Sequence, residues 1–108
     1  QKEDIFPDGI TSVKYLQANT LSSFHLKQNF PNPFNPITTI TFYLPKTQNV
    51  SLKVYDNQGK LVDSILNQKL SQGNHEYSWD ANQFASGVYY YQLISDDFVN
   101  TKKMLLMK

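Results

Sequence analysis

The sequence predicts an all-β fold, an antiparallel β-sandwich of about seven short strands. Aromatic residues make up 14% of the 108-residue chain, and aromatic side chains favour strands together with the abundant Val, Ile and Thr. Short runs of alternating apolar and polar residues follow one another, and each is ended by a turn signal. No segment shows a sustained helical period, so the remaining alternative is a small barrel made of the same strands.

Residues 1–23 differ from the rest of the chain. They are polar, with an acidic start and a Pro-Asp-Gly turn at residues 7–9. We predict that they form a linker or the end of a preceding domain, with a short strand over residues 10–16 as the alternative. The sandwich is then expected to occupy residues 24–108. Because the chain begins with Gln1 and carries no leader sequence, we expect an upstream region to precede it.

A proline-rich segment opens the predicted sandwich. Residues 30–36 contain three prolines, which fix φ and hold the preceding residues in extended geometry, so that a helix is excluded there. Residues 37–44 and 50–55 then alternate as two strands. The predicted inward-facing residues of these two strands are Ile40, Phe42, Leu44, Val50, Leu52 and Val54.

Asp56 and Gly59 are predicted to form the turn of a hairpin. Asp suits the first position of a turn, and glycine supplies the positive φ that closes it. Residues 60–67 form the returning strand, in which we expect Ile65 to be buried. The hairpin thus joins two neighbouring antiparallel strands.

Three further strands complete the predicted sandwich. Residues 75–80 alternate cleanly and place Trp79 on the face that we expect to be buried. Residues 87–94 contain the Val-Tyr-Tyr-Tyr run and form the most β-prone part of the chain. A turn at Asp96-Asp97 leads into the last strand, over residues 98–107.

The composition argues against several classes of function. All ten basic residues are Lys and the net charge is +1, which argues against nucleic-acid binding because Arg is favoured there. The absence of Cys excludes disulfides and thiolate metal sites. His25 and His75 lie far apart in the sequence, and the only glutamates are Glu3 and Glu76, so neither a metal centre nor the paired carboxylates of a glycosidase are indicated. We therefore predict a non-catalytic protein without a cofactor, a metal or a nucleic-acid partner.

Six segments of the chain together resemble one known family. The segments lie at residues 28–40, 52–60, 73–75, 79–80, 87–91 and 102–108. The first reads QNFPNPFNPITTI and the last reads KKMLLMK. In this order they resemble the type A C-terminal sorting domains of the type IX secretion system, found on proteins exported by Bacteroidetes and related bacteria. The Ig-like domain of the flagellar hook-capping protein is similar as well, and it shares the architecture without the sorting role.

The resemblance implies an Ig-like sandwich that acts as a C-terminal sorting signal. Such a signal directs a larger exported protein through the periplasm to the outer surface of the cell. The implied partners are the outer-membrane translocation machinery, a sortase-like processing protease and an upstream cargo domain in the same chain, and a weak homodimer is a further expectation. The alternative is an Ig-like structural or carbohydrate-contacting accessory module that is retained on the mature extracellular protein.

The resemblance also indicates which residues are recognised. We expect sorting information to be concentrated at residues 102–108, because a strand at the end of the chain has one flank free for docking. The structural alternative for the proline-rich segment is an edge cap with Phe34 in the core, and Asp56 and Gly59 also fit a purely structural turn. The expected recognition residues are Pro31, Asn32, Pro33, Phe34, Tyr55, Asp56, Gly59, Gly87, Tyr89, Lys102, Lys103, Met104 and Lys108.

Overall fold

The computed structural model describes residues 23–108, so the predicted linker, Ser23 apart, and its alternative strand lie outside the described residues. Within residues 23–108 the chain forms strands and no helix, which confirms the all-β prediction. The strands are β2 (His25–Leu26), β3 (Ile37–Leu44), β4 (Gln48–Asp56), β5 (Leu61–Leu70), β6 (Gly73–Asp80), β7 (Gly87–Ser95) and β8 (Val99–Leu106).

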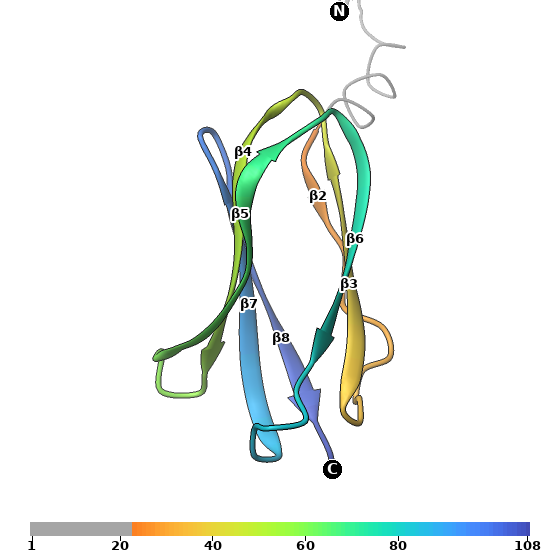
Figure 1. Ribbon diagram of the computed structural model, residues 1–108, viewed down its shortest axis with the longest axis vertical. Helices are drawn as coiled ribbons and strands as arrows, with labels where there is room; N and C mark the ends of the chain where they lie inside the picture. The colour runs from red at the N-terminus through yellow and green to blue at the C-terminus, as the bar shows by residue number, and fades with distance from the viewer. Residues whose placement is uncertain (1–22) are drawn as a thin grey trace, which may run out of the picture.

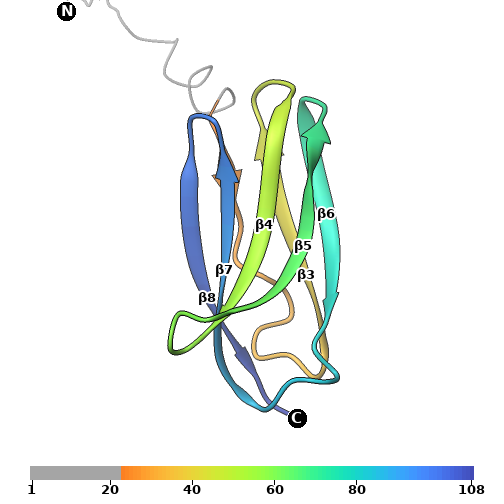
Figure 2. The same cartoon turned by 60° about the vertical axis from the view of Figure 1, so that its left-hand side comes forward.

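These strands form two antiparallel sheets that face each other (Figure 1). One sheet has the strand order β2-β3-β6 and the other has the order β5-β4-β7-β8. Figure 2 shows the four-stranded sheet from its outer side, with β8 and β5 as its two edges. Within residues 23–108 no strand of one sheet pairs with a strand of the other. The predicted sandwich is therefore confirmed over the barrel.

The strands from β3 onward are connected by hairpins within a sheet and by crossovers between the sheets. β4 and β5 form one hairpin and β7 and β8 form another, each within the four-stranded sheet. The connections from β3 to β4, from β5 to β6 and from β6 to β7 cross from one sheet to the other. As a result, the pairs β3–β6 and β4–β7 join strands that are not consecutive in the sequence.

The turn between β4 and β5 forms as its residues predict. The Asp56 Oδ1 accepts hydrogen bonds from the N–H groups of Lys60 at 3.0 Å and Gln58 at 2.9 Å. These two backbone donors, Lys60 first, hold the pKa of the Asp56 carboxyl below its usual value. Gly59 has a φ of 85°, and its N–H donates to the Asp56 carbonyl at 3.0 Å. The turn therefore needs both predicted residues for its own geometry.

The core lies between the two sheets and is made of alternate residues of each strand. Phe42, Leu52, Val54 and Trp79 are buried, as predicted. Burying one such side chain stabilises the fold by about 1.5–3 kcal/mol, so these alternations hold the sheets together. The other core residues are Leu26, Phe34, Ile40, Leu44, Val50, Leu66, Leu70, Ala81, Tyr89, Tyr91, Leu93, Met104 and Leu106.

The prediction for Ile65 is wrong, because its neighbour Leu66 takes the core position. Leu66 is 7% exposed, whereas Ile65 is half-buried at the edge of the core. The register explains this result: Leu52 faces Leu66 across the strand pair, and the next residue of β4, Lys53, faces Ser64. Ile65 is thus the additional residue of a β-bulge, and a bulge shifts the inward and outward alternation by one residue.

Candidate functional site

A proline-rich segment between β2 and β3 connects the two sheets, and we call residues 28–34 the strap. Near its start, the N–H of Phe30 donates to the Thr39 carbonyl of β3 at 3.0 Å, and the Thr39 N–H donates back at 2.9 Å. At its end, the N–H of Phe34 donates to the Leu105 carbonyl of β8 at 3.0 Å. The strap therefore begins on one sheet and ends on the edge of the other.

Three more hydrogen bonds join the strap to the outer edge of β8. The Gln28 Nε2 donates to the Lys103 carbonyl at 2.7 Å, and the Leu105 N–H donates to the Asn32 Oδ1 at 3.0 Å. The Met107 N–H donates to the last carbonyl of the strap at 2.9 Å. The sequence predicts that one flank of the last strand is free for docking. This prediction is wrong from Lys103 to Met107, because the strap covers that stretch.

A buried tyrosine holds the start of the strap from inside the sandwich. The Tyr91 hydroxyl donates to the Lys27 carbonyl and accepts from the Asn29 N–H, each at 2.7 Å. Burial raises the pKa of Tyr91 to about 12, so the phenol stays protonated at neutral pH. Because one hydroxyl satisfies both a carbonyl and an N–H of the incoming chain, it fixes where the chain leaves β2.

Asn29 extends this buried network to β3. Its Nδ2 donates to the Thr38 Oγ1 at 2.9 Å and to the Pro31 carbonyl at 3.1 Å, and the Thr38 hydroxyl also donates to that carbonyl at 2.9 Å. The Asn29 Oδ1 accepts from the Gln28 Nε2 at 2.7 Å. Asn29 is 2% exposed and Thr38 is fully buried. A buried network with its partners in place rigidifies the backbone that it bonds, and here that backbone is the strap.

The middle of the strap lies at the surface. Pro31, Asn32 and Pro33 are exposed, and the Phe30 side chain before them is 79% exposed. Proline has no N–H to donate, so a further strand cannot pair along this segment. The strap therefore ends the sheet on this side and presents a stiff, fixed surface.

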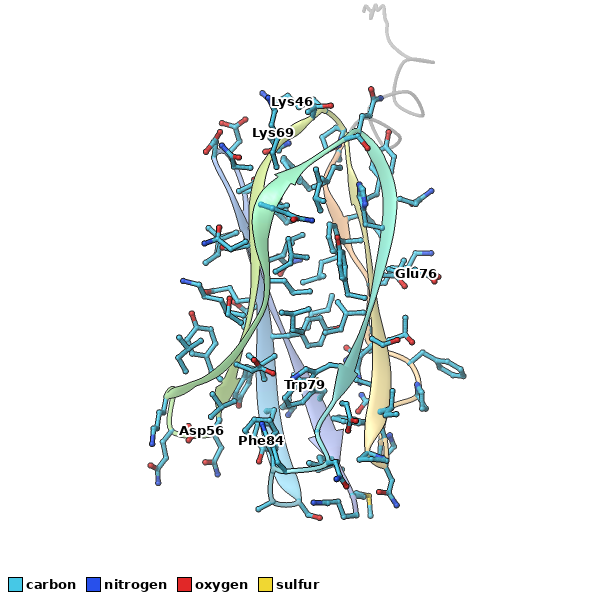
Figure 3. All side chains as sticks on the ribbon, in the orientation of Figure 1. Lys46, Asp56, Lys69, Glu76, Trp79 and Phe84 are labelled. Atoms are coloured by element: carbon cyan, nitrogen blue, oxygen red, sulfur yellow. The ribbon has the colours of Figure 1, made fainter. Side chains whose placement is uncertain are left out.

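Phe34 ends the strap inside an aromatic cluster at one end of the core. Its ring lies 6.0 Å from the Trp79 ring, which stacks on Phe84 at 5.4 Å and meets the edge of Tyr89 at 5.9 Å. The Trp79 Nε1 donates to the Asp63 Oδ2 at 2.8 Å. Figure 3 shows Trp79 and Phe84 between the sheets at this end. Phe34 thus fills the core, in agreement with the structural alternative.

Gly87 and Tyr89 lie at the start of β7, next to this cluster. The Tyr89 hydroxyl donates to the Ala85 carbonyl at 2.7 Å. Burial, and to a smaller extent the Asp56 carboxylate, raises the pKa of Tyr89. Gly87 has a φ of 151°, a conformation that favours glycine, where the chain enters β7. Both residues therefore build the fold beside β8.

The two lysines of the last strand lie on opposite faces of the sheet. Lys103 is exposed and faces outward opposite Tyr90, whereas Lys102 is half-buried on the core side opposite Tyr91. Met104, 1% exposed, follows on the core side. A lysine that points inward on an edge strand opposes the addition of another strand. Lys102 fits this role, whereas the charge of Lys103 lies in solvent.

Lys108 is bound to the loop before β7. Its Nζ donates to the Asn82 carbonyl at 2.6 Å and to the Phe84 carbonyl at 2.9 Å, and its N–H donates to the Ser86 Oγ at 2.9 Å. The ammonium therefore fixes the end of β8 against this loop.

The structure brings together some of the predicted residues and separates others. Those of the strap lie beside those of β8, from Lys103 onward. Asp56 and Gly59 form the β4–β5 turn, and the Tyr55 hydroxyl donates to the Gln92 Oε1 at 3.3 Å on the outer face of the sheet. The sequence prediction missed four residues that position the strap: Gln28, Asn29, Thr38 and Tyr91.

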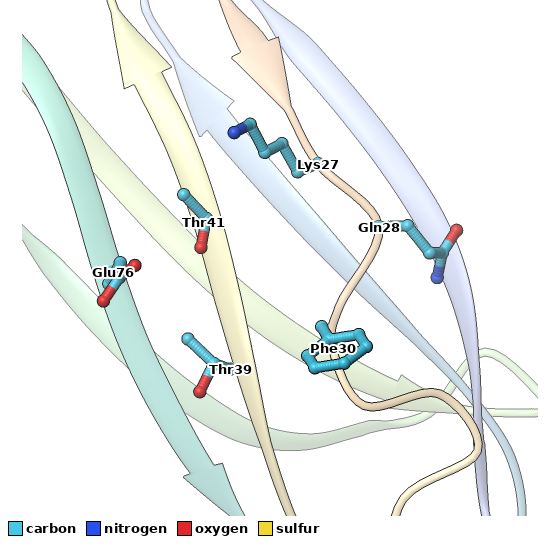
Figure 4. A pocket seen from close by; sticks show the side chains of 6 residues that line it. All are labelled: Lys27, Gln28, Phe30, Thr39, Thr41 and Glu76. Carbon is cyan, nitrogen blue, oxygen red and sulfur yellow. The ribbon is translucent and has the colours of Figure 1, made fainter.

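A shallow hollow of about 380 Å³ lies beside the strap on the outer face of the three-stranded sheet. Figure 4 shows the ring of Phe30 at one side of it and Glu76 of β6 at the other. The lining residues are Lys27, Gln28, Phe30, Thr39, Thr41 and Glu76. Among residues 23–108, no three His, Cys, Asp or Glu side chains gather closely enough to hold a metal ion.

Comparison with known families identifies the class of protein. The family described as "Secretion system C-terminal sorting domain" matches residues 28–107, which is well over half of the chain. The chain therefore belongs to this family of sorting domains. Its function is that of a C-terminal sorting signal for the type IX secretion system. This membership decides between the sorting role and the accessory module.

A solved structure shows the same fold. The chain is 21% identical to PorZ of Porphyromonas gingivalis, with a TM-score of 0.54 over 84% of this chain and 12% of that chain. PorZ is an essential bacterial surface component of the type-IX secretion system. The chain thus corresponds to a small part of PorZ, and the likeness concerns the fold. A search of curated proteins found no match.

Family membership has three general consequences. Sorting-signal domains are in general not catalytic. They interact with the secretion machinery and are joined to an N-terminal cargo region, and they direct export to the cell surface or the extracellular space.

Within the described residues, no helix is long and apolar enough to cross a membrane.

Proposed function

We propose that the outer-membrane translocation machinery recognises a composite surface made by the strap and the end of β8. We call this the terminal surface, and its exposed residues are Phe30, Pro31, Asn32, Pro33, Lys103, Met107 and Lys108. One observation carries the proposal: four hydrogen bonds join the two ends of the matched region at one place. The domain itself catalyses no reaction in this proposal.

The chemistry of the terminal surface suits recognition of a folded signal. Phe30 is 79% exposed and Met107 is 55% exposed, so the two ends of the strap each present apolar surface that a partner can bury. The strap between them is held by buried hydrogen bonds and prolines, so little conformational entropy is lost when a partner binds. Recognition therefore requires the folded domain rather than a linear peptide.

The route and the processing belong to the same proposal. The domain spans residues 24–108, passes through the periplasm with its upstream cargo, and is separated from the cargo by a sortase-like protease that cuts within residues 1–23. The polar, turn-containing sequence of that segment supports this position for the cut. Limited proteolysis of the purified chain should cleave there and leave residues 24–108 intact, whereas cleavage inside the strands would contradict the boundary.

A reporter fused upstream of the chain tests the proposal in a bacterium with a type IX system. Phe30→Ala combined with Met107→Ala should lower surface delivery several-fold and leave the melting temperature within a degree or two, since exposed substitutions change stability by less than about 0.5 kcal/mol. Ile37→Ala is the control, because Ile37 is 50% exposed outside the terminal surface. If the double variant is delivered at the rate of the control, the terminal surface is not the recognised site.

A second variant tests the charges of the last strand. Lys103→Ala, alone and combined with Lys102→Ala, should also lower delivery, and the single variant should keep the melting temperature because Lys103 is exposed whereas Lys102 is half-buried. Removing the whole of residues 101–108 is less informative, because Met104 and Leu106 belong to the core. Unchanged delivery of both lysine variants would assign recognition to the apolar part of the terminal surface alone and contradict a role for these lysines.

A further inference from the structure

The outer face of the four-stranded sheet has an unusual distribution of charge. In β4, Lys53 lies between the buried Leu52 and Val54 and faces outward. The register extends this outer face across β5, β7 and β8. We call these outward positions the basic face. Its members include Lys53, Tyr55, Tyr90, Gln92 and Thr101, with Lys69 near the end of the edge strand β5 and Lys103 where the face meets the terminal surface.

No carboxylate points outward from these four strands. They contain two acidic residues, Asp56 and Asp63. Asp63 accepts a hydrogen bond from the core residue Trp79, and Asp56 closes the β4–β5 turn with its own backbone. Asp96 and Asp97 lie in the β7–β8 turn, where Asp97 pairs with Lys46 at 3.1 Å. Asp96 also lines a hollow of about 190 Å³ at the β7–β8 turn end of the basic face, with Asn49 and Asn67. Lys53, Lys69 and Lys103 thus outnumber the one carboxylate that lines this face, and that carboxylate lies in a turn.

The opposite face of the sandwich has a different character. In β6 the outward residues alternate with Tyr77 and Trp79 and include Glu76 and Asp80, which are both exposed. Lys27 is exposed on the same sheet and lines the hollow with Glu76. Within the described part of the chain, outward carboxylates on strands thus lie on this outer face and not on the basic face.

Two side-chain hydrogen bonds connect three strands across the basic face. The Tyr55 hydroxyl donates to the Gln92 Oε1 at 3.3 Å, and the Gln92 Nε2 donates to the Thr101 Oγ1 at 3.0 Å. These bonds cross β4, β7 and β8, with Tyr90 beside Tyr55 in the register. Tyrosine supplies a large contact area at a low entropic cost, which is why it is enriched at protein interfaces.

We propose that the basic face docks on an acidic protein surface of the secretion machinery, separately from the terminal surface. The inference rests on the proposed function, since it names a second contact with that machinery. Four strands have three gaps of about 4.8 Å, and the four rows of outward residues from Lys69 to Tyr55 have three gaps of about 6.7 Å, which gives a flat area of roughly 15 by 20 Å. An area of this size fits a weak, transient contact, and complementary charge raises the rate of encounter more than the final affinity.

Charge neutralisation on and off the face gives a matched test in the full chain. Lys53→Gln with Lys69→Gln removes two charges from the basic face, whereas Lys27→Gln with Lys60→Gln removes two charges elsewhere. Poly-L-glutamate serves as the acidic polypeptide probe. The face variant should bind this probe at least fivefold more weakly than the control, and the difference should shrink at high salt because screening lengths are about 10 Å at 0.1 M and 3 Å at 1 M.

Delivery of the fused reporter is the second readout. The face variant should be delivered several-fold more slowly than the off-face control, at an unchanged melting temperature. Equal probe binding and equal delivery by the two variants would overturn the inference. Tighter binding to alginate than to poly-L-glutamate, lost in the face variant, would overturn it in favour of an acidic polysaccharide. Self-association at low salt that Glu76→Gln abolishes would overturn it in favour of a second copy of the chain.

The terminal-surface variant separates this inference from the proposed function. If Phe30→Ala with Met107→Ala keeps full delivery while the basic-face variant loses it, the proposed terminal surface fails and the basic face stands as the contact. If the terminal-surface variant loses delivery and the basic-face variant does not, the proposed function stands and the basic-face inference is overturned.

Discussion

The two edges of the four-stranded sheet are protected in different ways. At the β5 edge, register shifts at Leu52/Lys53 and at Val54/Tyr55 bend and twist the strand itself. At the β8 edge, a segment from before β3 covers the backbone from Lys103 to Met107. Both devices hinder the addition of a further strand. The bulges lie within the edge strand itself, whereas the strap is a separate segment held by hydrogen bonds and by the buried ring of Phe34.

This difference matters because β8 contains part of the proposed signal. An open strand edge is a template for pairing with other chains, and such pairing leads to aggregation. Under the strap, backbone groups of Lys103, Leu105 and Met107 are hydrogen-bonded, while the side chains of Lys103 and Met107 stay at the surface. Side chains rather than a bare edge are then available to a receptor.

Among the substitutions that test this comparison, replacing Phe34, the anchor of the strap, should lower the free energy of unfolding the most. Phe34→Ala removes a ring that is 2% exposed and packs on Trp79, so the free energy of unfolding should fall by about 3–5 kcal/mol. Ile65→Ala, at the bulged edge, should cost only about 1 kcal/mol because Ile65 is half-buried. Urea unfolding of the two variants measures both values, and equal losses would show that the strap contributes no more than the bulge.

Substituting the buried hydroxyl should have an intermediate effect. Tyr91→Phe leaves the Lys27 carbonyl and the Asn29 N–H without their partner, and an unsatisfied buried group costs about 1–3 kcal/mol. In the unchanged protein, the pKa of Tyr91 rises from 10.0 to about 12 on folding. Its contribution to stability is therefore complete below pH 10 and is lost as the pH rises through about 12.

Alkaline unfolding curves distinguish this cause from a loss of packing. The unchanged protein should lose stability steeply between pH 10 and about pH 12. The Tyr91→Phe variant should be less stable at neutral pH and should show a shallower loss over the same range. Parallel curves for the two proteins would mean that this phenol does not govern the alkaline transition.

The smallest effect is expected for the exposed hydrogen bond of the strap. Asn32→Ala removes the acceptor of the Leu105 N–H, and one such bond contributes about 1 kcal/mol. Hydrogen exchange of the Leu105 amide should become about fivefold faster, while the melting temperature shifts by only a few degrees. Asn67→Ala, an exposed substitution on β5, is the control and should leave that amide unchanged.

The sequence was sufficient to predict the sandwich and most of its core. Alternation in the strands around Phe42, Leu52 and Trp79 identified the buried face correctly because one side of each sheet is buried. It failed at Ile65, since a bulge changes the alternation without any signal in residue type. The turn at Asp56 and Gly59 was predictable because its chemistry is local.

The strap could not be derived in the same way. Its composition excluded a helix, but its place depends on contacts between residues far apart in the chain, such as Asn29 with Tyr91, 62 residues away. Tyr91 stood in the sequence as one of three consecutive tyrosines, and nothing local marks it as the one with a buried hydroxyl. The pairing of the strap with β8 likewise follows from the topology, which the motifs alone do not give.

The groups that close the strap are all uncharged at neutral pH. They are the amides of Gln28 and Asn29, the hydroxyls of Thr38 and Tyr91, and backbone groups. Forming these hydrogen bonds neither binds a proton nor releases a counterion. Below the pH at which the Tyr91 phenol ionises, neither pH nor salt concentration should therefore change them. The strap should therefore keep its position on β8 in media of very different acidity and salt content, while the exposed lysines around it still respond to the ionic strength of each medium.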